Sequence, residues 1–271
     1  MSGRLVVCPT PIGNLEDITL RTLAVLREAD VVACEDTRRT KVLLERYGVS
    51  VPTVSYHEHN ETARAGELVK RIEAGEVVAL VSDAGMPLVS DPGFAVVHAA
   101  IAAGAEVEVL PGPSSVLTAL VASDLPSDSW RFGGFLPRKA GELADALKGT
   151  TETLVAFESP NRIGKSLAAL VEIDPERPVA VCRELTKLHE EVVRGTATEV
   201  AQHFAGKDVK GEIVVVIGGA APATADLAAA LDALDRLVDA GAKLRPAAAV
   251  VADLTGVSAN DLYRERTGGV S

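Results

Sequence analysis

Short, continuously apolar runs alternate with amphipathic segments through the first 122 residues of the chain. Runs of this kind are typical of strands that helices cover on both faces, and strand–helix alternation favours a parallel sheet. We therefore predict an α/β fold that begins with a parallel sheet. Its strands are expected at Arg4–Cys8, Asp30–Cys34, Val51–Tyr56, Glu76–Ser82 and Glu106–Leu110. Its helices are expected at Thr19–Glu28, Thr40–Tyr47, Glu61–Ala74, Pro92–Ala103 and Ser114–Ala122.

The alternation becomes less regular beyond a polar, turn-rich segment, Ser123–Ser129, which predicts a linker and a second α/β domain with a mixed sheet. Strands are expected at Trp130–Phe135, Leu154–Glu158, Val179–Arg183 and Ile213–Ile217, with a weaker candidate at Glu190–Thr196. Helices are expected at Ile163–Glu172 and Ala197–Phe204.

The pattern is helical after the small-residue segment Ala220–Thr224. Helix Pro246–Leu254, a glycine turn and helix Asn260–Arg266 have the spacing of a helix-turn-helix, although two ordinary packing helices share that pattern. The predicted organisation is an N-terminal α/β domain at residues 1–122, a linker at 123–129, a second α/β domain at 130–219 and a helix-turn-helix-like C-terminal extension at 220–271.

Loops rich in glycine and proline follow three of the predicted strands. Ligands of open α/β sheets bind beyond the carboxyl ends of the strands, and glycine lets a ligand approach the main chain closely. None of these loops matches GxGxxG or a P-loop, which argues against a nucleoside triphosphate. A single loop of this composition is explained by an ordinary turn. Three such loops at the same edge of a parallel sheet predict a binding pocket. They are Pro9–Asn14, Ser82–Pro87 and Leu110–Ser115.

The stretch VSDAGMPLVSDPG contains two similar turns directly after a predicted strand. In the second turn, Asp91 suits a helix N-cap and Pro92 the first helical position. The first turn continues as loop through Met86 and Pro87, so we expect Asp83 to be free to meet a ligand.

Composition narrows the possible partners and surroundings. The formal net charge of −11 and the aromatic content of 3% argue against a long footprint on bare nucleic acid, so any RNA contact requires a local patch or a protein-coated partner. The 3 cysteines lack CxxC spacing, which favours a reducing compartment. No segment approaches the roughly 20 apolar residues of a membrane span. We expect a soluble, cytoplasmic protein without a membrane segment.

Six motifs occur in the order and spacing of one family: VVCPTPIGNLEDIT, ACEDTRRT, VALVSDAGMPLVSDPG, VLPGPSS, FESPNR and CRELTKLHEE. The chain resembles the ribosomal RNA small subunit methyltransferase I family, a branch of the tetrapyrrole methylase superfamily, over nearly its whole length. It departs from the family pattern at Met86, where threonine is common, and at Arg245–Ala249, where lysines are frequent.

The resemblance implies two α/β domains of tetrapyrrole-methylase type and a homodimer. It also implies an enzyme that uses S-adenosylmethionine to methylate the ribose 2′-hydroxyl of a decoding-centre cytidine in 16S rRNA within the 30S subunit. The cofactor would lie in the cleft between the domains. By motif position, it would be lined by Pro9, Thr10, Pro11, Ile12, Gly13, Ser82, Asp83, Ala84, Gly85, Met86, Pro87, Pro111, Gly112, Pro113, Ser114 and Ser115.

Two charged clusters follow strands and offer groups that could help a ribose hydroxyl lose its proton. Asp36 and Arg38 lie in the first cluster, and Glu184 and Lys187 in the second. We expect these four residues near the target nucleotide, although salt bridges across an interface explain the clusters equally well. The segment His57–Glu61 has no third histidine or cysteine at ligand spacing, so no metal is expected.

Two other functions stay open on the sequence alone. One is a methyltransferase of the same fold that acts on a tetrapyrrole or another small molecule. The other is a non-catalytic ribosome-assembly factor, which would not need to bind S-adenosylmethionine.

Overall fold

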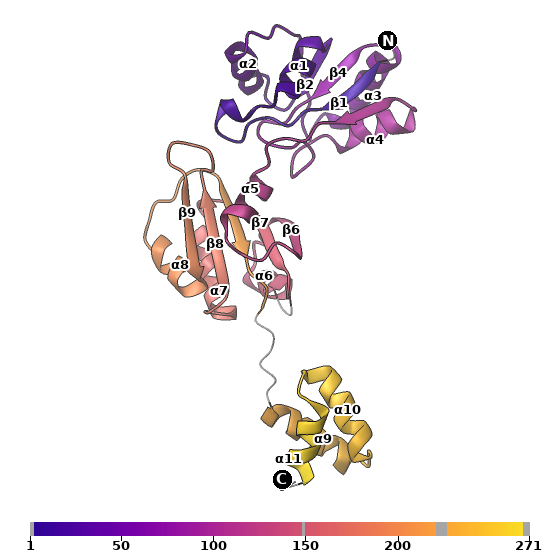
Figure 1. Ribbon diagram of the computed structural model, residues 1–271. Helices are drawn as coiled ribbons and strands as arrows, with labels where there is room; N and C mark the ends of the chain where they lie inside the picture. Colours follow the sequence, from indigo (N-terminus) through magenta and orange to yellow (C-terminus); the bar gives the residue numbers. More distant parts are fainter. Residues whose placement is uncertain (1–2, 148–149, 221–226, 268–271) are drawn as a thin grey trace. The chain divides into compact units, whose positions relative to one another are not determined.

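The computed structural model describes residues 3–147, 150–220 and 227–267 (Figure 1). The chain divides into two compact units. One comprises Met1–Ala146 and Glu152–Gly218, and the other comprises Leu147–Thr151 and Gly219–Ser271. The larger unit contains two five-stranded sheets, and the smaller one contains the C-terminal helices.

The first sheet is entirely parallel and has the strand order β3-β2-β4-β1-β5. Its central strands are buried on both faces, as their continuous apolar sequences predict. The strands are β1 (Arg4–Val7), β2 (Val31–Cys34), β3 (Thr53–Ser55), β4 (Val77–Leu80) and β5 (Glu106–Val109).

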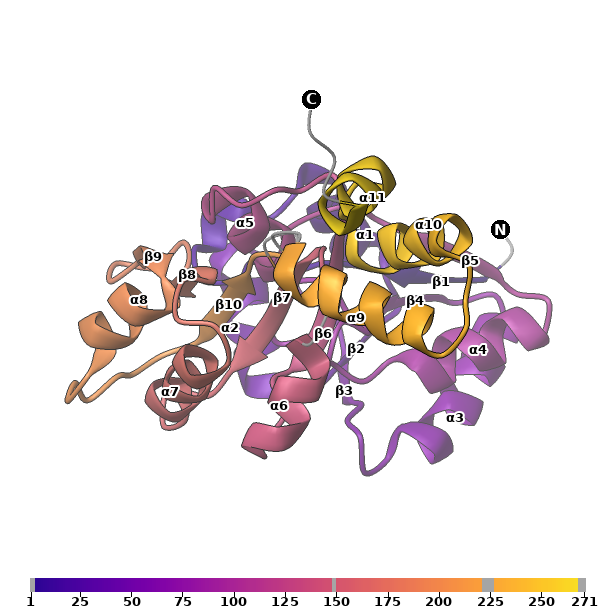
Figure 2. The ribbon, with the colours of Figure 1, turned by 90° about the horizontal axis from the view of Figure 1, so that it is seen from below.

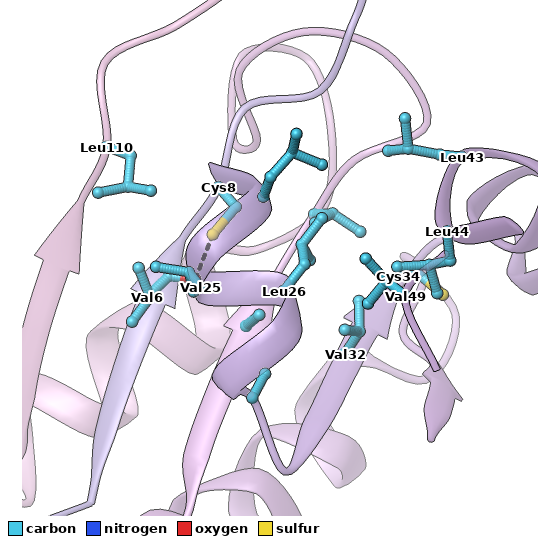
Figure 3. Packing of buried hydrophobic residues seen from close by; sticks show 14 of the residues in the cluster. Val6, Cys8, Val25, Leu26, Val32, Cys34, Leu43, Leu44, Val49 and Leu110 are labelled. Carbon is cyan, nitrogen blue, oxygen red and sulfur yellow. Dashed lines mark hydrogen bonds between the residues drawn. The ribbon is translucent and has the colours of Figure 1, made fainter. Parts of the chain in front are cut away.

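Helices cover both faces of this sheet and make three layers (Figures 1 and 2). Helices α1 (Leu20–Glu28) and α2 (Thr37–Arg46) pack on one face, where Leu26 and Leu44 meet the strand side chains (Figure 3). Helices α3 (Glu61–Glu73) and α4 (Phe94–Ala102) pack on the other face. A short 3-10 turn, η1 (Leu15–Asp17), precedes α1.

The second sheet is mixed and has the order β6-β7-β10-β8-β9, in which only β6 and β7 run parallel. Helix α5 (Ser115–Ala122) packs on this sheet, although the sequence pattern groups it with the first domain. The strands are β6 (Trp130–Phe135), β7 (Thr153–Glu158), β8 (Pro178–Arg183), β9 (Glu191–Thr196) and β10 (Ile213–Ile217). The remaining helices are α6 (Ala140–Leu147), α7 (Ile163–Ile173) and α8 (Ala197–Phe204).

The smaller unit contains the three described C-terminal helices: α9 (Leu227–Asp239), α10 (Leu244–Thr255) and α11 (Ala259–Thr267). They share a small core in which Leu234, Val251 and Leu262 are buried. Gly256 ends α10 in the left-handed conformation, with φ 71°, which glycine adopts without steric cost. Most of the predicted linker Ala220–Thr224 lies outside the described residues. None of the helices in the described ranges combines the length and apolar character needed to cross a lipid bilayer.

The predicted start of α4 is wrong. Gly93, with φ 144°, occupies the N-cap position and the helix begins at Phe94, so Asp91 and Pro92 lie outside it. Helix α2 begins at Thr37 rather than Thr40, because the Asp36 side chain accepts the Arg38 backbone N–H and caps it. Helix α6 has no counterpart among the predicted elements.

Candidate active site

The three glycine- and proline-rich loops lie against one another. Thr10 and Gly85 exchange two backbone hydrogen bonds of 2.9 Å, which join the first loop to the second. The Thr10 hydroxyl also donates to the Ser82 carbonyl at 3.0 Å. In the third loop, a Cβ on Gly112 would lie 2.6 Å from Cγ of Pro9. Only glycine therefore lets the third loop approach the first so closely.

The first loop also contacts the segment after β8 in the second domain. The Asn14 backbone N–H donates to Oγ1 of Thr186 at 3.0 Å. A Cβ on Gly13 would lie 2.5 Å from Cγ of Lys187 and 2.7 Å from Oγ1 of Thr186. Ile12 packs in the same apolar cluster as Leu185. A glycine at position 13 is thus what allows the two loops to come together.

A cavity of about 320 Å³ lies where these loops meet the second sheet. Its volume falls at the lower end of the range of small-molecule sites, about 300–1,000 Å³. The loops of the first sheet contribute Ile12, Ala84, Gly85, Met86, Val89, Asp91 and Ser114, and the start of α5 contributes Ser115 and Val116. The second sheet and its loops contribute Phe135, Phe157, Glu158, Ser159, Pro160, Cys182, Leu185, Gly211, Glu212, Ile213 and Val214.

Six of the sixteen residues expected at the cofactor line this cavity: Ile12, Ala84, Gly85, Met86, Ser114 and Ser115. The others lie in the same three loops without lining it, and several of them hold the loops together as described above. They are Pro9, Thr10, Pro11, Gly13, Ser82, Asp83, Pro87, Pro111, Gly112 and Pro113.

Asp83 is not free, contrary to expectation. Its carboxylate accepts the Asp36 backbone N–H at 3.0 Å and pairs with Nη1 of Arg39 at 3.4 Å. Of the two aspartates, the one that lines the cavity is Asp91. Burial raises the pKa of Asp91 to about 6, and the negative charge of Glu35 adds to this effect. Of the two similar turns, the first is therefore engaged within the protein through Asp83, and the second places Asp91 at the cavity without starting the helix.

Glu158 is a second cavity carboxylate that the sequence reasoning did not single out. Its buried side chain accepts the Ser166 hydroxyl at 2.5 Å and the Ser159 backbone N–H at 2.6 Å, and it pairs with Arg162 at 3.3 Å. It is the second residue of the FESPNR motif, and its position at the end of an apolar strand could have marked it. Both of its oxygens are engaged by its own domain.

The four residues expected near a target nucleotide form two ion pairs outside the cavity lining. Arg38 donates to both oxygens of Asp36, at 3.0 and 2.7 Å, and its hydrogen bonds lower the pKa of Asp36 to about 2. Lys187 donates to Glu184 at 2.7 Å and to the cavity residue Glu212 at 3.1 Å. The hydrogen bond from Lys187 lowers the pKa of Glu184.

His57 forms local contacts within its own turn. Its backbone N–H donates to Oδ1 of Asn60 at 2.9 Å, and its ring lies edge-on to His59 with centroids 6.0 Å apart. In the part of the chain that the structure describes, no three histidine, cysteine or carboxylate side chains are grouped so that they could hold a metal ion.

Similarity to solved structures agrees with this architecture. The methyltransferase CobJ superposes with a TM-score of 0.62 at 22% identity, and covers 81% of this chain and 95% of its own. Uroporphyrin-III C-methyltransferase of Thermus thermophilus, in complex with S-adenyl homocysteine, gives a TM-score of 0.56 at 22% identity and covers 80% of this chain and 97% of its own. At this identity the likeness concerns the fold.

Similarity in sequence is closer. The ribosomal RNA small subunit methyltransferase I of Mesorhizobium japonicum is 49% identical over 265 residues, which cover 96% of this chain and 90% of the relative. The protein of the same name from Thermotoga maritima is 45% identical, over 80% of this chain and 99% of its own. A family model for tetrapyrrole (corrin/porphyrin) methylases matches residues 4–201. Taken with the two sheets and the loops between them, these similarities mean that the chain belongs to the tetrapyrrole methylases, in the branch of the ribosomal RNA small subunit methyltransferases I.

Proposed function

We propose that the protein transfers the methyl group of S-adenosylmethionine to the ribose 2′-hydroxyl of a decoding-centre cytidine in 16S rRNA. The methyltransferase activity and the cofactor follow from the family. The rRNA substrate is supported by the names of relatives that match along most of the chain. The single observation that carries the proposal is the cavity enclosed by the family's loop motifs and the second sheet.

The residues at the cavity fit S-adenosylmethionine. The Ala84–Met86 segment and the Ser114–Ser115 pair offer main-chain groups and small side chains that can approach a nucleoside closely. Phe135 and Phe157 provide apolar surface for the cofactor. We expect the three loops to hold the cofactor through the residues that line the cavity, supported by the rest of Pro9–Gly13, Ser82–Pro87 and Pro111–Ser115.

Bound at this place, S-adenosylmethionine supplies a methyl group already activated by the sulfonium. The chain supplies position: holding two reactants in line can lower a barrier by about 7–11 kcal/mol. The apolar walls formed by residues such as Phe157 and Val214 keep water from the reacting atoms. A ribose hydroxyl is a weak acid, so a side chain that takes its proton also contributes.

The two ion pairs outside the cavity are proposed contacts for the nucleotide strand. Asp36 donates its backbone N–H to Asp83 of the second loop. The Glu212 backbone N–H, from a residue that lines the cavity, donates to Glu184 at 2.9 Å. Each ion pair is therefore joined by a hydrogen bond to a loop at the cavity. This supports the proposal that Arg38 and Lys187 lie beside the substrate.

We propose the assembled small subunit as the substrate, because a chain with net charge −11 is poorly suited to bare RNA. On the particle, shape and ribosomal proteins share the recognition, and the target base can be unstacked toward the cavity. A homodimer in the cytoplasm belongs to the same proposal. Purified protein with labelled S-adenosylmethionine should methylate 30S subunits faster than naked 16S rRNA, whereas equal rates would contradict recognition of the particle.

The decisive experiment maps ribose methylation on 16S rRNA from cells that lack the protein and from cells that carry it again. Loss and restoration of methylation at one decoding-centre cytidine is the expected result. An unchanged methylation map would refute the proposed substrate. Calorimetry with S-adenosylmethionine distinguishes the methyltransferase from a non-catalytic ribosome-assembly factor, because an assembly factor need not bind the cofactor.

A further inference from the structure

Asp91 lies in a segment whose backbone is held in rarely adopted conformations. Leu88 and Ser90 have φ values of 72° and 65°, in the left-handed region that residues other than glycine seldom occupy. Gly93 follows with φ 144°, and a Cβ there would lie 2.6 Å from Cδ1 of Leu88. Such conformations persist where the surrounding structure fixes them, and they are concentrated at functional sites.

Local structure does not explain why Asp91 is placed there. Aspartate is among the best N-cap residues, and Asp91 precedes α4 by three positions. The helix nevertheless begins after Gly93, and the Tyr56 hydroxyl, not Asp91, accepts a first-turn backbone N–H, that of Val96, at 3.2 Å. The segment therefore places Asp91 in the cavity lining rather than at the helix end.

Asp91 also differs from the other two carboxylates that line the cavity. Glu158 accepts hydrogen bonds from Ser166 and Ser159 and pairs with Arg162, and Glu212 pairs with Lys187. Asp91 has no ion pair with any residue in the described part of the chain. It is thus the cavity carboxylate whose protonation would break no ion pair within the described residues.

The charged groups around Asp91 are negative. Glu35 after β2, Asp83 after β4 and Glu212 before β10 each raise its pKa in addition to burial, while a hydrogen bond from the Ser82 side chain lowers it. The resulting pKa, about 6, lies close to the neutral range in which a general base is most effective.

We propose that Asp91 is the proton acceptor for methyl transfer, which rests on the proposed function. The hydroxyl O–H bond breaks, its proton passes to the Asp91 carboxylate, and the oxygen forms a bond to the methyl carbon. The carbon–sulfur bond breaks at the same time, and its electron pair stays on sulfur, which leaves as a neutral thioether. Asp91 releases the proton to water after the product leaves.

The test compares wild type with Asp91→Asn, Asp91→Glu and a control, Asp128→Asn, which removes an exposed carboxylate. Calorimetry measures S-adenosylmethionine affinity, and rapid mixing measures single-turnover methyl transfer to 30S subunits from pH 5 to 9. Asp91→Asn should bind the cofactor within about fivefold of wild type and transfer the methyl group about 10²- to 10⁴-fold more slowly at pH 7.5. The wild-type rate should rise with a midpoint near pH 6, a step that Asp91→Asn lacks and Asp91→Glu retains.

The outcomes separate the inference from the function on which it rests. An Asp91→Asn rate within about threefold of wild type, or an unchanged pH step, would overturn the role of Asp91 alone. Loss of cofactor binding in Asp91→Asn would assign the residue to cofactor binding and would also overturn it. A wild-type protein that binds S-adenosylmethionine but does not methylate 30S subunits would overturn the proposed function itself.

Discussion

Replacing Gly13 with alanine adds a methyl group where the second domain already has atoms. The new Cβ would lie 2.5 Å from Cγ of Lys187, 2.7 Å from Oγ1 of Thr186 and 2.9 Å from the Leu185 carbonyl oxygen. None of the three can move away cheaply. Lys187 is held at its end by two carboxylates, Thr186 accepts a backbone N–H, and the carbonyl belongs to the main chain. Overpacking of this kind costs about 1–3 kcal/mol.

In a unit of this size, each kcal/mol lowers Tm by about 2–4 °C, so Gly13→Ala should melt about 2–12 °C below wild type. Movement of the loops to relieve the clash would also weaken S-adenosylmethionine binding. A loss of about 1–3 kcal/mol of binding free energy corresponds to an affinity about 5- to 150-fold lower. Differential scanning calorimetry and titration calorimetry measure the two effects. The matched control is Gly66→Ala on α3, whose Cβ would meet nothing within 4 Å and should stabilise by about 0.5–1 kcal/mol. A Gly13→Ala protein with the Tm and cofactor affinity of wild type would show that the two loops do not pack as described.

Three further predictions concern stability and reactivity. Folding raises the pKa of Asp91 from 3.8 to about 6, so the ionised side chain destabilises the folded protein above pH 6, and this penalty disappears as the pH falls toward 3.8. Asp91→Asn should therefore have a higher Tm than wild type at pH 7.5, and the difference in Tm should be smaller at pH 4.5. Burial raises the pKa of Cys8 to about 12 and of Cys182 to about 11, so a thiol reagent at pH 8 should label none of the 3 cysteines in the native protein and all of them in denaturant. Thr196→Ala removes the capping box of α8 and should cost about 1 kcal/mol by urea unfolding, whereas the exposed Thr62→Ala on α3 should cost less than half as much.

The strands were predictable because their signal is local. Val77–Leu80 is buried on both faces, and an unbroken apolar run reports that directly. The first residues of the helices were less predictable, because a side chain that caps a helix can move its start away from the residue that the apolar pattern indicates. The Asp36 side chain extends α2 by one turn beyond its apolar pattern, and the strained segment before Gly93 delays α4. The packing of α5 on the second sheet depends on contacts between segments far apart in sequence. The spacing of apolar residues within α5 does not indicate which sheet the helix contacts.

The loops at the candidate site were predictable for a similar reason, since glycine and proline mark them in the sequence. The facing wall was not, because Ile213 and Val214 lie in an ordinary apolar strand and nothing local distinguishes them from core residues. The different contacts of Asp83 and Asp91 were unpredictable for the same reason. The two residues stand in nearly identical turns, and only tertiary contacts, with Arg39 and the Asp36 backbone N–H, engage the carboxylate of Asp83.

The position of β1 in the first sheet bears on how the chain is made. Arg4 is in register with Val77 on one side and with Glu106 on the other, so the N-terminal strand lies between two strands that are synthesised much later. At about 5–20 residues per second, roughly 5–20 s pass between the emergence of β1 and that of its second neighbour. During that interval the apolar residues of β1 have no strand partner and are exposed to aggregation. The time at which β1 can pair with both neighbours depends on how fast the ribosome translates the chain up to the end of β5.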